Sequence, residues 1–297
     1  MSATSQVQSV LDRADADFDN SLQRLFALLR IKSISADPAF VGDCRAAADH
    51  LAVEIAALGF DAEVRPTEGH PAIVATCRGN RGNRPHALFY GHYDVQPVDP
   101  LELWHRPPFD PVITDHADGR KIIVARGAQD DKGQLSTFIE ACRAWKAVTG
   151  ELPIDLTVVI EGEEEVGSKN FVPFLDVHKA DLAADFALVC DTGMWDPSTP
   201  AITTALRGLV YEEVKIKAAN RDLHSGVYGG GAQNPIRVLT RILGGLHDEH
   251  GHEAEEEGPC HAPVEALVPP HRHVRDSDRN PEQSDRRGRP GAVTVLS

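Results

Sequence analysis

Apolar side chains recur at steps of three and four residues along the first thirty positions of the chain. This period places them on one stripe of a helix, so the pattern predicts a helical region at residues 7–30 with one buried face. A second helix is predicted at residues 43–58, followed by Gly59, where a left-handed cap is common. The residues of the first stripe are Val10, Leu11, Phe18, Leu22, Leu25, Phe26 and Leu29.

Five short apolar runs follow, each of strand length and rich in β-branched or aromatic residues. Several are almost continuously apolar, as strands covered on both faces are. Helical patterns lie between them at residues 132–148 and 168–179. This alternation predicts an α/β fold in which a mostly parallel sheet is flanked by helices. The runs are AIVATCR from Ala72, HALFYGHYD from His86, KIIVARG from Lys121, IDLTVVIEG from Ile154 and DFALVCD from Asp185.

The pattern changes near Arg207. The segment LVYEEVKIKAANRDLHSG alternates between polar and apolar residues, which predicts a half-exposed strand, and a helix is predicted at residues 233–247. We therefore expect a catalytic domain at residues 1–207 and a partial α+β domain at 208–250. Residues 251–297 are rich in Pro, Arg, His and Glu and hold no aromatic residue, which predicts a disordered tail.

Composition and charge indicate a soluble globular protein and argue against nucleic-acid-binding and membrane proteins. A chain of 297 residues with 41% hydrophobic content has the composition of a soluble globular protein and is long enough for two domains. Its formal net charge of -15 argues against a nucleic-acid partner, which would need a Lys/Arg surface. No run approaches the roughly 18 apolar residues that would span a bilayer, and the start lacks a signal peptide, so we expect a cytoplasmic protein with no membrane partner. The five cysteines show no C-x-x-C spacing, which argues against a thiolate zinc site.

Carboxylates and an imidazole stand at the ends of the predicted strands. GHYDVQP supplies His92 and Asp94, GAQDDKG supplies Asp130 and Asp131, and CDTG supplies Asp191. Because ligands of an open α/β sheet bind beyond the carboxyl ends of its strands, we expect these side chains to converge. A set of His and carboxylate ligands without thiols suits Zn²⁺, or alternatively Mn²⁺ or Co²⁺. Asp94 lies two residues beyond His92, where it can accept the other imidazole N–H and fix the tautomer.

The run VVIEGEEEVGS ends a strand in four glutamates, which is costly unless water or a cation neutralises them. Each motif taken singly has a simple structural interpretation: a helix cap, a hydrated loop or, for DLHSGVYGG with His224, a flexible turn. Their occurrence together, each at the end of a predicted strand or in the segment that follows, favours a metal site.

The motifs GHYDVQP, GAQDDKG, EGEEEVGS, LVCD and DLHSGVYGG, in this order, resemble those of the di-zinc exopeptidase and deacylase family. That family includes carnosinase-type dipeptidases, aminoacylase and succinyl-diaminopimelate desuccinylase, and GHYDVQP and HSGVYGG favour the dipeptidase branch. The resemblance covers roughly residues 18–250. It implies a phosphorylase/hydrolase-like zinc exopeptidase domain with a lid domain, two Zn²⁺ per site, a homodimer, and a dipeptide or N-acyl amino acid as substrate.

Carried over residue by residue, the resemblance implies that His92 and Asp191 bind one metal, Glu165 binds the other and Asp130 bridges both. Glu164 would be the general base, a metal-bound hydroxide would attack the scissile carbonyl, and His224 would stabilise the oxyanion in a partner subunit's site. The two metals would neutralise Glu164 and Glu165. We expect Glu161 and Glu163 to face the other way and to be solvated.

The chain departs from the family pattern after residue 250, where the family's catalytic domain resumes and supplies a final His ligand. The tail holds His261, His271 and His273 in Pro- and Arg-rich surroundings, and we do not expect them to replace it. We therefore predict a truncated or frameshifted chain with about one bound metal and poor solubility from open strand edges. The alternative to an active hydrolase is a catalytically inactive fragment that lacks the final His ligand.

Overall fold

The computed structural model describes residues 3–79, 84–196, 198–199, 201–206, 208, 213–247 and 293–296. The chain divides into two compact units, Met1–Thr203 and Thr204–Ser297. The domain ranges 1–207, 208–250 and 251–297 that the sequence suggests stay a proposal. Among the described residues, no helix is both long enough and apolar enough to cross a bilayer.

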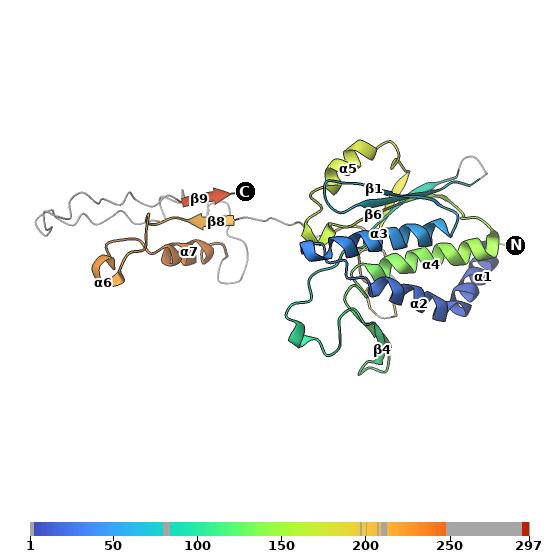
Figure 1. Cartoon of the computed structure of the whole chain (residues 1–297), viewed down its shortest axis with the longest axis horizontal. Coiled ribbons are helices and arrows are strands. Elements are labelled where there is room, and N and C mark those ends of the chain that lie inside the picture. The colour runs from blue at the N-terminus through green and yellow to red at the C-terminus, as the bar shows by residue number, and fades with distance from the viewer. Residues whose placement is uncertain are drawn as a thin grey trace, which may run out of the picture. The chain divides into compact units, whose positions relative to one another are not determined.

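The first unit is built on a five-stranded sheet in the order β1-β2-β6-β3-β7 (Figure 1). β3 pairs in parallel with β6 and β7, whereas β2 pairs antiparallel with β1 and β6. The predicted α/β class with a mostly parallel sheet flanked by helices is confirmed: β1, β6, β3 and β7 run in one direction, and β2 alone runs against them. The strands are β1 (Asp61–Arg65), β2 (Ala72–Cys77), β3 (His86–His92), β6 (Asp155–Glu161) and β7 (Phe186–Val189).

The run KIIVARG forms a strand that does not join this sheet. β5 (Lys121–Val124) pairs antiparallel with β4 (Val112–Asp115) in a separate two-stranded sheet. Only five residues join the two strands, which permits a hairpin but not the long crossover that a parallel neighbour requires. The sequence pattern identified the strand correctly and could not identify its partner.

Helices cover both faces of the five-stranded sheet. α2, α3 and α4 pack through apolar residues such as Leu28, Leu51 and Leu135 against one face, and α5 packs through Phe171 and Phe174 against the other (Figure 1). The predicted helix at residues 7–30 is two helices that part at Asp17. The helices of this unit are α1 (Ala3–Ala16), α2 (Phe18–Leu29), α3 (Val41–Ala56), α4 (Lys132–Thr149) and α5 (Phe171–His178).

Successive residues of the central strands enter opposite layers of the core. In β3, Phe89 belongs to the cluster under α3 and α4, whereas Tyr90 packs on the cluster under α5. In β6, Val158 and Val159 divide in the same way. Because side chains alternate across a strand, a strand between two helical layers needs apolar residues at almost every position. This explains the continuous apolar runs.

The second unit contains β8 (Glu213–Ile216), α6 (Ser225–Tyr228), α7 (Pro235–Leu243) and β9 (Val293–Leu296). The predicted half-exposed strand and the helix after it are confirmed, and Asn234 caps α7 by accepting hydrogen bonds from the N–H groups of Ile236 and Arg237. β9 pairs antiparallel with β8. The predicted disordered tail otherwise lies outside the described residues, and β9 shows that its last apolar run forms a strand.

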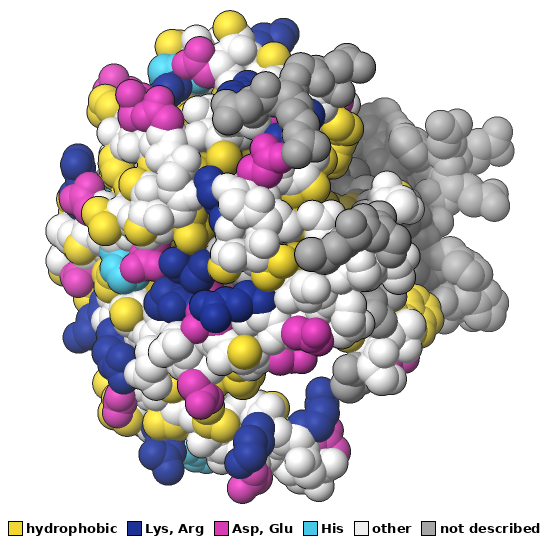
Figure 2. All heavy atoms as spheres, turned by 90° about the vertical axis from the view of Figure 1, so that its right-hand side faces the viewer, with side chains coloured by type: hydrophobic (Ala, Val, Ile, Leu, Met, Phe, Trp, Pro, Cys, Tyr) yellow, Lys and Arg dark blue, Asp and Glu magenta, His cyan; other side chains and the backbone are white. Residues whose placement is uncertain are grey.

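Acidic, basic and apolar side chains are interspersed over the face of the molecule that Figure 2 shows. Such a mixed surface is typical of soluble domains.

Candidate metal centre

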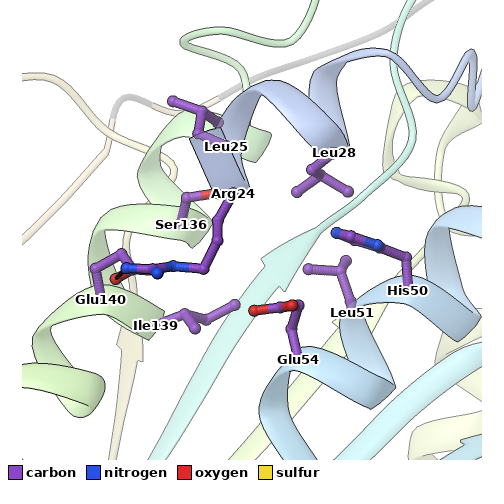
Figure 3. Close-up of a pocket in the computed structure, with 9 residues that line it drawn as sticks. All are labelled: Arg24, Leu25, Leu28, His50, Leu51, Glu54, Ser136, Ile139 and Glu140. Carbon is purple, nitrogen blue, oxygen red and sulfur yellow. Dashed lines mark hydrogen bonds and ion pairs between the residues drawn. The ribbon is translucent and has the colours of Figure 1, made fainter. Parts of the chain in front are cut away.

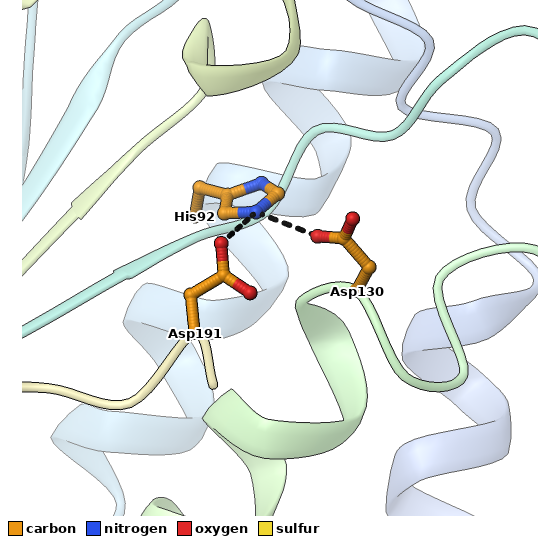
Figure 4. Close-up of side chains that lie close together, drawn as sticks. All are labelled: His92, Asp130 and Asp191. Carbon is orange, nitrogen blue, oxygen red and sulfur yellow. Dashed lines mark hydrogen bonds and ion pairs between the residues drawn. The ribbon is translucent and has the colours of Figure 1, made fainter. Parts of the chain in front are cut away.

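Three side chains from separate elements meet beyond the carboxyl ends of β3 and β7. His92 is the last residue of β3, Asp191 follows β7, and Asp130 precedes α4. Each offers one ligand atom, and the three atoms lie within 4.8 Å of one another (Figure 4). His92 Nε2 lies 3.1 Å from Asp130 Oδ1 and 3.7 Å from Asp191 Oδ2. β3 and β7 are parallel neighbours, so their ends deliver these groups to the same edge of the sheet.

The chemistry of this donor set fits a divalent cation. One imidazole nitrogen and two carboxylates are ligands for Zn²⁺, Mn²⁺ or Co²⁺. The His92 side chain is fully buried, whereas those of Asp130 and Asp191 are 60% and 31% exposed. The cluster is therefore anchored in the protein on one side and open to solvent on the other, as a catalytic metal site must be for substrate to enter.

Asp94 is fully buried behind this cluster and contacts several donors. Its Oδ1 lies 3.3 Å from His92 Nδ1 and accepts a hydrogen bond from the N–H of Glu164 at 3.2 Å. Its Oδ2 accepts from the N–H of Glu165 at 3.1 Å and from Ser35 Oγ at 2.6 Å. Burial by itself lowers the pKa of His92, but Asp94 and the neighbouring carboxylates outweigh it and raise that pKa to about 10. Asp94 thus faces the imidazole nitrogen opposite the cluster.

Glu164 and Glu165 lie on a 3-10 turn, η3 (Glu164–Val166), that follows β6. Glu164 Oε2 lies 4.0 Å from His92 Nε2, at the margin of the cluster. Glu165 Oε2 accepts a hydrogen bond from Gln96 Nε2 at 2.9 Å and is not one of the three clustered ligands. Burial raises the pKa of both glutamates, and nearby carboxylates add to the effect.

The expectation that Glu161 and Glu163 are solvated is wrong. Glu161 is 2% exposed, and its Oε1 accepts hydrogen bonds from Tyr90 Oη and Ser168 Oγ at 2.7 and 2.9 Å. Glu163 is 8% exposed and accepts from Asn170 Nδ2 at 3.0 Å. The extended strand β6 ends at Glu161 and the turn η3 begins at Glu164, after which Gly167 and Ser168 adopt positive φ values of 88° and 53°. Both carboxylates therefore point into the protein.

His224 belongs to the second unit. It caps the short helix α6, and its Nδ1 accepts a hydrogen bond from the N–H of Gly226 at 3.0 Å. The role that the resemblance implied for it, across a subunit interface, stays a prediction.

Two ionisable residues directly after Asp130 are buried: Asp131, which the sequence analysis placed among the converging carboxylates, and Lys132, for which it predicted no role. Asp131 is 1% exposed, and its Oδ2 accepts a hydrogen bond from the N–H of His92 at 3.0 Å. Burial raises the pKa of Asp131 to about 7. Lys132 is fully buried and donates to the carbonyl oxygens of Leu28 and Ile31 at 3.3 and 2.7 Å. The sequence holds no signal for Lys132, because a Lys at a helix start is usually exposed.

A separate groove lies among α2, α3 and α4, where Arg24 pairs with Glu140 at 2.6 Å (Figure 3). Its open volume is about 20 Å³, which is room for about one water molecule and not for a substrate. None of His92, Asp130 and Asp191 lines it. The groove is therefore a gap in helix packing rather than a candidate active site.

A family model described as Peptidase family M20/M25/M40 matches residues 88–277 of the chain. The matched stretch extends beyond residue 250, where the motif-based resemblance ends.

Individual proteins match the chain over most of its length. The Cys-Gly metallodipeptidase dug1 of Schizosaccharomyces pombe is 30% identical over 257 residues, covering 83% of this chain and 52% of that protein. The Beta-Ala-His dipeptidase of Rattus norvegicus is 32% identical over 194 residues, covering 65% of this chain and 38% of that protein. The solved structure of the dipeptidase Dug1p from Saccharomyces cerevisiae superposes with a TM-score of 0.68 at 29% identity, covering 83% of this chain and 53% of that one. The chain thus spans about half the length of these relatives, or less.

Proposed function

Because the chain belongs to peptidase family M20/M25/M40, we propose that it is a metal-dependent hydrolase that cleaves the amide bond of a dipeptide. The observation that carries the proposal is the grouping of His92, Asp130 and Asp191 within 4.8 Å. Relatives named as metallodipeptidase and dipeptidase support the dipeptide over the N-acyl amino acid as substrate. The homodimer and the cytoplasmic location stay predictions.

The divalent cation, Zn²⁺ or alternatively Mn²⁺ or Co²⁺, would be held by His92, Asp130 and Asp191. When bound, it would lower the pKa of a coordinated water and polarise the scissile carbonyl. Asp130 is the proposed bridge to a second cation, for which Glu165 is the proposed ligand. The fully buried Asp94 would hold the His92 imidazole so that Nε2 faces the cluster, and this orientation is supported by the 3.3 Å distance between Asp94 Oδ1 and His92 Nδ1.

Glu164 is the proposed general base. It would take a proton from the attacking water and deliver it to the nitrogen of the leaving amine. Two observations support this role: its Oε2 lies 4.0 Å from His92 Nε2, and its side chain is 39% exposed and thus open to water and substrate. His224 is the proposed oxyanion donor.

An inactive fragment is the second candidate, and one observation favours it. The three clustered ligands account for a single cation, and Glu165 is hydrogen-bonded to Gln96 outside that cluster. A chain that holds one cation where the mechanism needs two would bind metal without turning over a dipeptide.

Elemental analysis of zinc-supplemented full-length chain, with a dipeptide hydrolysis panel, tests the proposal. The active-enzyme proposal expects turnover that Glu164→Gln lowers by about 10²- to 10⁴-fold while bound zinc is unchanged. The matched control is Glu102→Gln, at an exposed glutamate of the 3-10 helix Leu101–Leu103, which should alter neither quantity. Bound zinc without turnover of any dipeptide favours the fragment. Absence of both rejects the metal site itself.

A further inference from the structure

A short segment after α2 runs beside the residues that follow β3. Ser33 Oγ donates a hydrogen bond to the carbonyl oxygen of Tyr93 at 2.6 Å, and the N–H of Val95 donates to the carbonyl oxygen of Ser33 at 2.9 Å. Ile34 forms a parallel bridge with Val95, and both side chains are buried. The backbone of residues 33–35 is therefore held firmly against the chain that carries the candidate site.

The next residue of this segment reaches the site through Asp94. Ser35 Oγ donates to Asp94 Oδ2 at 2.6 Å, which is shorter than the bonds that the same carboxylate accepts from Glu164 and Glu165. A hydroxyl bonded to a carboxylate at this distance forms a charge-assisted hydrogen bond, about twice as strong as a neutral one. The contact joins residues 59 positions apart in the sequence.

The Asp94 carboxylate has no spare acceptor capacity. An ionised carboxylate offers about four lone-pair sites. Oδ2 serves Ser35 and the N–H of Glu165, and Oδ1 serves the N–H of Glu164 and faces His92. The observed rotation of the carboxylate serves all four groups at once. Ser35 makes the shortest of these contacts, from a backbone that the contacts of Ser33 and Ile34 hold in place.

We propose that Ser35 is a positioning residue, whose hydroxyl holds Asp94 in the orientation that serves both His92 and the turn η3. Its meaning for catalysis rests on the function proposed above. The Ser35 hydroxyl acts through Asp94, and Ser35 is not one of the clustered ligands.

Amide hydrogen exchange in metal-free protein tests this without any need for activity. Removal of the hydroxyl by Ser35→Ala leaves Asp94 Oδ2 free to swing away from η3. We expect the exchange rates of the Glu164 and Glu165 amides to rise on the order of tenfold, because both amides depend on Asp94 for protection. The Ser168 amide is the internal control. It lies in the same loop but donates to the carbonyl oxygen of Glu163, so its rate should not change.

Two further variants separate positioning from simple destabilisation. Ser35→Thr keeps the hydroxyl and should restore slow exchange at both glutamates. Ser21→Ala removes a hydroxyl that donates to the Glu140 carboxylate at 3.0 Å. It makes the same chemical change away from the candidate centre, so the exchange rates of the Glu164 and Glu165 amides should not change. The proposal is overturned if the two amides keep their rates in Ser35→Ala, or if Ser168 accelerates equally.

Zinc affinity, measured by competition with a chelating indicator, gives the second readout. Ser35→Ala should weaken zinc binding about tenfold, the lower end of the range for groups that orient a metal ligand, and Ser35→Thr should not. Unchanged zinc affinity in Ser35→Ala contradicts the link to His92. If the wild-type chain binds no zinc, the proposed function fails, and the exchange rates still decide the role of Ser35.

Discussion

The backbone N–H of His92 donates a hydrogen bond to Asp131 Oδ2 at 3.0 Å, which ties the end of β3 to the start of α4. The neighbouring carboxylates of Asp130 and Asp131 therefore have different surroundings. Asp130 faces the cluster with a side chain that is 60% exposed, and Asp131 is buried against the backbone of His92. The imidazole and the first carboxylate of the cluster are thus fixed to each other through the backbone as well as through their side chains.

Replacement of Asp131 tests this link. Asp131→Ala leaves the buried N–H of His92 without an acceptor, and we expect the free energy of unfolding to fall by about 1–3 kcal/mol. Asp131→Asn keeps an acceptor oxygen and removes a charge that burial disfavours. Its free energy of unfolding should therefore stay much closer to that of the wild type. Urea unfolding of EDTA-treated protein measures both. Equal stabilities of the Ala and Asn variants would contradict the role of Asp131 as the acceptor for the N–H of His92.

The imidazole of His92 should titrate far from the usual range in metal-free protein. Hydrogen bonding to Asp94 and the nearby carboxylates outweighs burial and raises its pKa to about 10. The folded protein then holds this proton more tightly than the unfolded chain does. The resulting stabilisation is complete below about pH 6.5 and is lost as the pH rises through about 10.

The ¹³Cε1 chemical shift of His92 reports the midpoint of this titration directly, and Asp94→Asn should move it toward lower pH. Zinc needs the deprotonated imidazole, so its apparent affinity should rise by up to about tenfold per pH unit between about pH 7 and 9. A midpoint near 6.5 in the metal-free wild type would show that Asp94 does not stabilise the imidazolium.

The buried carboxylate of Glu161 depends on Tyr90 for one of its two hydrogen bonds. Tyr90→Phe should lower the free energy of unfolding by about 1.5–3 kcal/mol, since a hydrogen bond to a charged group is lost. Tyr228→Phe is the matched control, because that ring is 41% exposed in the second unit and should change little. Thermal or urea unfolding compares the two. No difference between them would mean that Glu161 finds another donor.

Close packing at Gly162, directly after β6, excludes any side chain. A Cβ there would lie 2.2 Å from Tyr93 Oη, and the Tyr93 ring is fully buried. Gly162→Ala should therefore cost about 1–3 kcal/mol or more in the free energy of unfolding. Gly42 in α3 has no heavy atom within 4 Å of such a Cβ, so Gly42→Ala should be neutral or stabilise by up to about 1 kcal/mol. Thermal unfolding of the two variants checks the contrast, and similar effects would argue against the tight contact at Tyr93.

Local pattern was enough to predict the elements of the first unit that surround the site. Strands such as β3 and β6 were predictable because they lie between two helical layers and need apolar residues on both faces. The placement of His92 and Asp191 at strand ends was also predictable. Parallel neighbours end at the same edge of a sheet, so chemistry that follows such strands in sequence converges in space.

Contacts between segments that are distant in the sequence decided the order of the strands and the burial of the site residues. β6 inserts between β2 and β3, and β2 runs against its neighbours, which makes the sheet mixed; no local pattern records which strand becomes a neighbour. The inward turn of Glu161 and Glu163 depends on donors from Tyr90, Ser168 and Asn170 that only the folded chain assembles. The hydrogen bond from Ser35 to Asp94 joins residues that are 59 positions apart in the sequence. The amino-acid sequence determined which groups could carry the chemistry, and tertiary packing determined which of them are buried, because burial and hydrogen bonding belong to the whole fold.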